Sequence, residues 1–117
     1  MDRGKIIELW RPVSAEELRA IKELDSAAFV PPAGVRQRYL TFTTRGHAIE
    51  LARDWLVPIY GEGFVVRCVV CARLLDHLVH DHVVTRSDMD YWIPLKGLEA
   101  FHATLIGKIE VVYQHPE

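Results

Sequence analysis

The alternation of apolar and polar positions is clearest between Tyr39 and Thr43, where it predicts a half-buried strand. Tyr39, Thr41 and Thr43 fall on one face of that strand, and Leu40 and Phe42 fall on the other. One side of the strand is therefore expected to carry hydroxyl groups and the other to enter the core.

The stretch from Gly63 to Ala72 is apolar on both faces except at Arg67, which is typical of a central strand covered on each side. Weaker alternation predicts the remaining strands, at residues 5–11, 80–84, 90–93 and 108–114.

The first helix has a clear start signal, because Ser14 and Glu17 form a capping box. Its apolar face is expected to continue to Ala28, and the helix to stop before Pro31, since proline cannot extend the hydrogen-bond ladder. The other expected helical segments are one that is capped by Thr43 or Thr44 and ends at Pro58 and Gly61, a turn at residues 74–78, and a short helix at 98–105.

These strands and helices, without repeat or linker, predict a single α+β domain over residues 1–117. Half of the residues are hydrophobic, 26% are charged and the formal net charge is −2, which is typical of a soluble globular protein. The sequence contains no long basic run, so a general nucleic-acid binder is not expected, because contacts to phosphates need clustered cations. No membrane span and no apolar leader segment are recognised, so a cytoplasmic protein without membrane association is expected.

Asp88 and Asp90 are the clearest candidates for chemistry. In an extended strand, residues two apart point to the same face, so these carboxylates are expected to share one space. Paired acids of this kind are typical of proton or cation chemistry. The alternative interpretation is a strand end whose carboxylates are simply solvated.

A histidine cluster offers a second kind of site. His77, His80 and His82 surround Asp81, and His80 and His82 would share a strand face. Imidazole is a good ligand for zinc, nickel and copper, so a metal-dependent hydrolase is one hypothesis. A surface segment that happens to carry histidines is the alternative, and we expect that no metal is bound.

Cys68 and Cys71 have the spacing of a redox or zinc motif, but they lie in a strand-like apolar run. Residues three apart on a strand point to opposite faces, so the pair is expected to be two buried core thiols.

Most aromatic residues are expected in the core, where a small domain needs their area; these are Trp10, Trp55, Tyr91 and Trp92. Tyr39 differs, because it shares a strand face with two threonines and is expected to line a polar cleft. A ring in that position can stack on a base or a nicotinamide. His47, in the first turn of the second helix, is expected to face the same surface or to pack beside it.

The order of these features resembles the ADP-ribosyltransferase pattern of arginine, Ser-Thr-Ser and Glu-x-Glu. Here the corresponding residues are Arg11, then Thr41, Thr43 and Thr44, then Asp88 and Asp90. Residues 6–114 are also similar to a family of small, mostly bacterial ADP-ribosylation proteins. The segments that carry this resemblance are Leu9-Trp-Arg-Pro, Ala52-Arg-Asp-Trp, Gly63-Phe-Val-Val-Arg, Tyr91-Trp-Ile-Pro, Phe101 and Ile106-Gly-Lys-Ile-Glu.

The resemblance implies a split β-sandwich of about six strands with two to three helices, which binds NAD in a cleft and transfers ADP-ribose to an acceptor. It implies that Arg11 holds the phosphate or ribose of NAD, and that Thr41 and Thr43 support the nicotinamide side. It further implies that Asp90 is the catalytic acid and that Asp88 orients the acceptor.

Asp90 stands where the family pattern usually has a glutamate, which is one methylene longer. Because a misplacement of about 1 Å can lower a rate on the order of a hundredfold, a second hypothesis is a catalytically inactive nucleotide-binding or regulatory module of the same fold.

Overall fold

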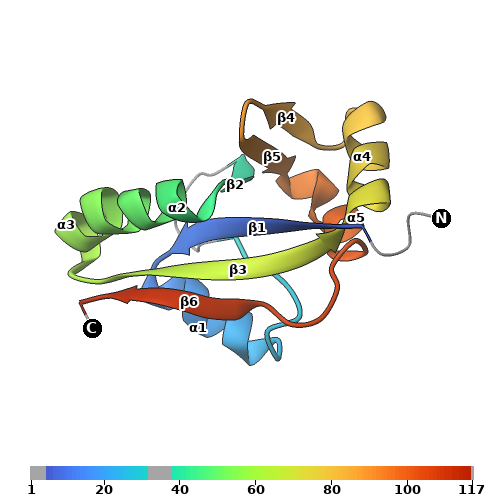
Figure 1. Ribbon diagram of the computed structural model, residues 1–117. Helices are drawn as coiled ribbons and strands as arrows, with labels where there is room; N and C mark the ends of the chain where they lie inside the picture. The colour runs from blue at the N-terminus through green and yellow to red at the C-terminus, as the bar shows by residue number, and fades with distance from the viewer. Residues whose placement is uncertain (1–4, 32–37, 117) are drawn as a thin grey trace.

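A computed structural model describes residues 5–31 and 38–116 of the chain, and within them the fold is α+β with two antiparallel three-stranded sheets (Figure 1). The first sheet has the order β1-β3-β6, and the second has the order β2-β5-β4. The strands are β1 (Ile6–Val13), β2 (Tyr39–Phe42), β3 (Gly63–Cys71), β4 (Thr85–Ser87), β5 (Asp90–Pro94) and β6 (Glu110–His115). The predicted α+β class is confirmed and the number of strands agrees, but five of the six predicted strands are present and β4 was not predicted.

The central position of β3 follows from its two apolar faces, as the sequence predicts. It pairs with β1 from Phe64 to Cys71 and with β6 on its other side. Val66 and Val70 enter the main core between the two sheets, whereas Val65 faces a smaller cluster beneath a helix. A strand that is covered on both faces needs apolar residues at both parities.

The main core fills the space between the sheets. Phe42 lies at its centre, with its ring centroid 4.9 Å from that of Phe29 and 5.0 Å from that of Phe101. Leu40 and Ile93, which are fully buried, come from the inward faces of β2 and β5. The second sheet therefore turns one face to the core, which leaves its opposite face available.

Helix α1 (Ala15–Glu23) begins as predicted, because the Ser14 hydroxyl accepts a hydrogen bond from the backbone N–H of Glu17 at 3.2 Å. It ends earlier than expected, before Ala28. Asp25 and Ser26 have φ values of 57° and 55°, and this left-handed backbone cannot continue a right-handed helix. The chain then turns inward and places Phe29 in the core.

A longer helix covers the outer face of the first sheet (Figure 1) and consists of α2 (Arg45–Leu51), a π-helical turn η1 (Ala52–Leu56) and α3 (Val57–Tyr60). Thr44 caps it as expected, and it ends at Gly61, whose φ of 82° favours glycine. Pro58 does not end it, contrary to expectation. The π turn immediately before Pro58 interrupts the regular bonding pattern, so the missing N–H is tolerated there.

The region from residue 72 to 84 differs most from the sequence-based expectation. In place of a single turn, it forms helix α4 (Ala72–His80), and the strand expected at residues 80–84 is wrong. His82 has a φ of 62°, which closes the helix in a turn. After β5 come the short helices η2 (Leu95–Gly97) and α5 (Leu98–His102). With α2 to α3 counted as one helix, the described residues contain four α-helices and not two to three.

Cys68 is buried, and burial raises the pKa of its thiol to about 12. Cys71 is only partly buried, so the expectation of two core thiols is confirmed for Cys68 alone; both thiols are free. None of the described helices is long and apolar enough to cross a membrane.

Candidate functional site

The two acids singled out in the sequence lie on the β4–β5 hairpin. Ser87 pairs with Asp90, so Asp88 and Met89 form a two-residue turn between the strands. Asp88 has a φ of 52°, a conformation that aspartate tolerates better than most residues. The expectation that both acids lie on one extended strand is therefore wrong, because only Asp90 is in the strand. Both side chains nevertheless line the same pocket.

That pocket is open and has a volume of about 470 Å³. One wall is the start of α2, and the other is the β4–β5 hairpin. Its lining residues are Thr43, Thr44, Gly46, His47, Glu50, Asp88, Met89 and Asp90. Four residues predicted to form a site, which are Thr43, His47, Asp88 and Asp90, thus come together from segments more than forty residues apart.

The pocket has an acidic character. Glu50, Asp88 and Asp90 supply carboxylates, and none of the described lining residues is a lysine or an arginine. His47 Nδ1 lies 3.7 Å from Glu50 Oε2, within one turn of the helix. Such a lining favours a positively charged or hydroxyl-donating group over a phosphate.

Thr43 joins the pocket to the seam between the two sheets. Its backbone forms an isolated bridge to Trp10 of β1, with N–H to O distances of 2.8 and 3.0 Å in the two directions. The Thr43 Oγ1 and Trp10 Nε1 atoms are buried and have no hydrogen-bond partner in the described part of the chain. An unpaired buried polar group costs about 1–3 kcal/mol, and in native proteins such a group usually has a partner such as an ordered water.

The face of the second sheet that leads away from the pocket is open. On β2, Tyr39 and Thr41 alternate with the buried Leu40, as predicted from the sequence. On β5, Asp90 and Trp92 alternate with the buried Tyr91. Thr41 lies opposite Trp92 in the sheet register. Opposite residues of an antiparallel pair share a face, so the predicted residues Tyr39 and Thr41 lie on the same face as Asp90.

Trp92 was expected in the core, and this is wrong. It is 39% exposed on the open face, and its ring meets that of Tyr39 at 85° with the centroids 6.2 Å apart. Trp55, expected in the core as well, is 65% exposed on η1. Tyr91 is buried as expected. The alternation of Asp90, Trp92 and Pro94 with Tyr91 and Ile93 is the sequence signal that would have placed Trp92 beside Asp90.

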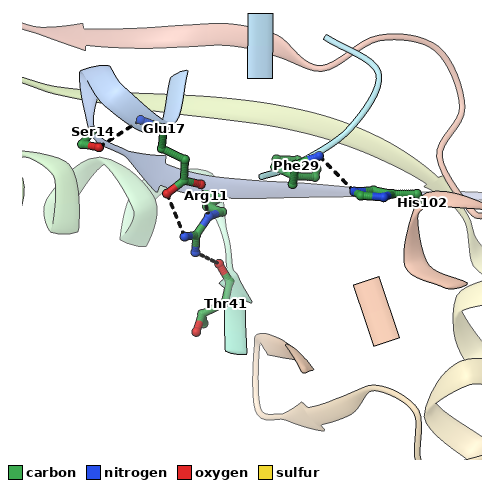
Figure 2. Close-up of polar contacts among 6 residues, drawn as sticks. All are labelled: Arg11, Ser14, Glu17, Phe29, Thr41 and His102. Carbon is green, nitrogen blue, oxygen red and sulfur yellow. Dashed lines mark hydrogen bonds and ion pairs between the residues drawn. The ribbon is translucent and has the colours of Figure 1, made fainter. Parts of the chain in front are cut away.

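Arg11 does not line the pocket. It lies in the core, 6% exposed, where Nε and Nη2 donate to the two carboxylate oxygens of Glu17 at 2.7 and 3.0 Å (Figure 2). Nη1 donates to the carbonyl of Thr41 at 3.3 Å. Burial raises the pKa of Glu17, and the Arg11 guanidinium opposes that shift. The contact between Arg11 and NAD remains a prediction from resemblance, while the observed contacts join β1, α1 and β2.

The histidine cluster has a different geometry from the expected one. His77 and His80 lie on α4, and His82 follows in the turn, so no strand face is shared. Within residues 5–31 and 38–116, no group of three or more histidine, cysteine, aspartate or glutamate side chains could hold a metal ion. The described residues therefore provide no ligand set for the metal-hydrolase hypothesis.

His102 was assigned no role from the sequence, yet it forms an internal contact of note. Its Nε2 accepts a hydrogen bond from the backbone N–H of Phe29 at 2.9 Å (Figure 2), and the two rings are nearly parallel at 14°. Burial lowers the pKa of the imidazole. The partner lies far away in the sequence and is a backbone group, so no spacing rule could have found it.

Comparisons of this chain with protein-family models, with curated proteins and with solved structures found no match.

Proposed function

We propose that the pocket binds the nicotinamide ribose of NAD and that the protein transfers ADP-ribose from NAD to an acceptor. The observation that carries this function is the convergence of Asp88, Asp90, Thr43 and His47 on one pocket. The sequence predicts all four as site residues, and they lie together although distant segments supply them.

The acidic lining suits the reaction. The pyridinium ring of NAD is a cation, and its ribose hydroxyls are hydrogen-bond donors. The Asp90 carboxylate would accept a hydrogen bond from a ribose hydroxyl and stabilise the positive charge that develops at the anomeric carbon. The glycosidic C–N bond breaks, its electron pair leaves on the nicotinamide nitrogen, and the acceptor forms the new bond to the same carbon. The Asp88 carboxylate would take the proton that the acceptor loses.

Asp90→Asn tests this role, because it removes the charge and keeps the shape. We expect the rate of nicotinamide release from NAD, measured by chromatography, to fall. The expected decrease is about a hundredfold to a thousandfold, the usual loss when an electrostatic stabiliser is removed. Asp81→Asn is the matched control, since Asp81 is an exposed aspartate in the turn after α4. A wild-type rate in Asp90→Asn would refute the assignment.

An inactive nucleotide-binding module is the second candidate, and the short Asp90 side chain favours it. Calorimetry separates the two functions: NAD binding without nicotinamide release indicates the module. If length limits catalysis, Asp90→Glu should raise the rate of nicotinamide release, because the carboxylate then extends about one bond further toward the ribose. Unchanged release in Asp90→Glu would show that length is not the limit.

A further inference from the structure

We propose that the open face of the second sheet is a stacking subsite for a free nucleoside or nucleobase, which is the acceptor of the transfer. The subsite consists of Tyr39, Thr41, Thr85, Ser87, Asp90 and Trp92, and we call it the aromatic face. Binding of the ring stands on the observations below, whereas its role as acceptor rests on the proposed function.

Two large rings are exposed side by side on this face. Tyr39 is 46% exposed and Trp92 39% exposed, and they meet edge to face. This pairing holds both rings before any ligand arrives, so little rotamer freedom is lost on binding. An aromatic ring held in this way offers its flat surface to another planar group, as in proteins that stack bases.

Hydroxyl groups border the two rings. Thr85 lies opposite Trp92 in the sheet register, and Ser87 lies opposite Asp90. Thr41 neighbours Trp92 from the other side. Hydroxyls donate and accept, so they can match the ring nitrogens, carbonyls and amino groups at the edge of a base.

The charge of the aromatic face selects against a nucleic-acid strand. Among the described residues that the register places on this face, Asp90 is the only charged one, and Asp88 lies beside it in the turn of the hairpin. A strand of nucleic acid needs lysines or arginines to neutralise its phosphates. The occupant is therefore an uncharged nucleoside or base without a phosphodiester backbone.

The position of the aromatic face suits an acceptor. Trp92 is two residues from Asp90 along β5, which corresponds to about 7 Å at the usual rise of a strand. A ring stacked on Trp92 thus borders the pocket in which the glycosidic bond breaks. A ring nitrogen or exocyclic amine would attack the anomeric carbon, nicotinamide would leave with the bonding electron pair, and the nitrogen would pass its proton to Asp88.

Calorimetric titration with adenosine, guanosine and cytidine, in the absence of NAD, tests the subsite. We expect binding by the wild type, and a loss of affinity of about tenfold in Trp92→Ala and in Tyr39→Ala. Trp92→Phe should retain most of the affinity, because it keeps a ring. Trp55→Ala and Tyr60→Ala are matched controls, since both residues are at least as exposed but lie on η1 and α3; their affinity should equal the wild type.

Three outcomes would overturn the subsite: no nucleoside binding, equal losses in the Trp55→Ala control, or tighter binding of methyl glucoside or of a single-stranded oligonucleotide. The proposed function fails separately. If nucleosides bind through Trp92 but NAD releases no nicotinamide, the stacking subsite stands and the transferase does not. If nicotinamide is released but mass spectrometry finds no ADP-ribosylated nucleoside, the acceptor assignment alone fails.

Discussion

The position of Asp90 in the pocket is set by its neighbours in the sheet. It is the first residue of β5, and its pairing with Ser87 fixes the direction of its side chain toward the open face. Its spacing from Asp88 does not place the two carboxylates on one strand face, because Asp88 lies in the turn before β5. The residue types were nevertheless informative, since a two-residue turn and a strand start can both direct carboxylates into one pocket.

The contact of His102 with Phe29 predicts a pH dependence of stability. Nε2 can accept the Phe29 N–H only when it is unprotonated, and the pKa of His102 is lowered in the fold. The unfolded chain therefore binds the proton more readily than the native protein. The stability from this contact is present above the unfolded pKa of about 6.5 and is lost as the pH falls through the folded value.

The measurement compares urea unfolding at pH 7.5 and pH 5 for the wild type and His102→Gln, whose side-chain oxygen can still accept a hydrogen bond. The wild type should lose more stability than the variant over this interval, as judged by the free energy of unfolding. His102→Ala at pH 7.5 should cost about 1–3 kcal/mol, since a backbone N–H loses its partner. Parallel curves for wild type and His102→Gln would exclude His102 as the titrating group.

At the scale of elements, the buried ion pair of Arg11 and Glu17 joins β1, α1 and β2. Arg11→Met should lower the free energy of unfolding by about 3–5 kcal/mol, because Glu17 is left as an unpaired buried charge. The double variant Arg11→Met with Glu17→Leu should recover much of that loss. Urea unfolding of the three proteins measures both effects.

NAD titration of the folded double variant then distinguishes two roles of Arg11. If Arg11 only joins elements, the affinity for NAD should match that of the wild type. A clear loss of affinity would show that Arg11 also contacts the ligand, as the family resemblance implies.

Element starts were more predictable than element ends, because caps are local. Ser14 and Thr44 cap their helices as expected from short motifs. The end of α1 and the turn at His82 depend on left-handed backbone at non-glycine residues. This conformation is uncommon at such residues, and no sequence motif predicts it here. Before His82, the apolar residues Leu74, Leu75, Leu78 and Val79 recur at helical spacing, so the sequence held a signal for α4 that the prediction of a single turn and a strand did not use.

At the scale of the molecule, the pocket lies where the two sheets meet. The sequence predicted every strand except β4, and it predicted the polar face of Tyr39, Thr41 and Thr43. It could not show that this face leads into a pocket bordered by α2. The partner of Arg11 was likewise hidden, because a strand residue and a helix residue six positions apart meet only after α1 folds back. Candidate residues were thus largely identifiable, whereas their grouping required the fold.

The bridge between Trp10 and Thr43 gives this arrangement a further consequence. Its two backbone hydrogen bonds connect the sheets, and Thr43 is also a lining residue of the pocket. Any molecule held by Thr43 therefore restrains the seam, and amide hydrogen exchange at Trp10 and Thr43 should slow on ligand binding. The exchange rates of these two backbone amides would thus report occupancy even for a ligand that is never chemically changed.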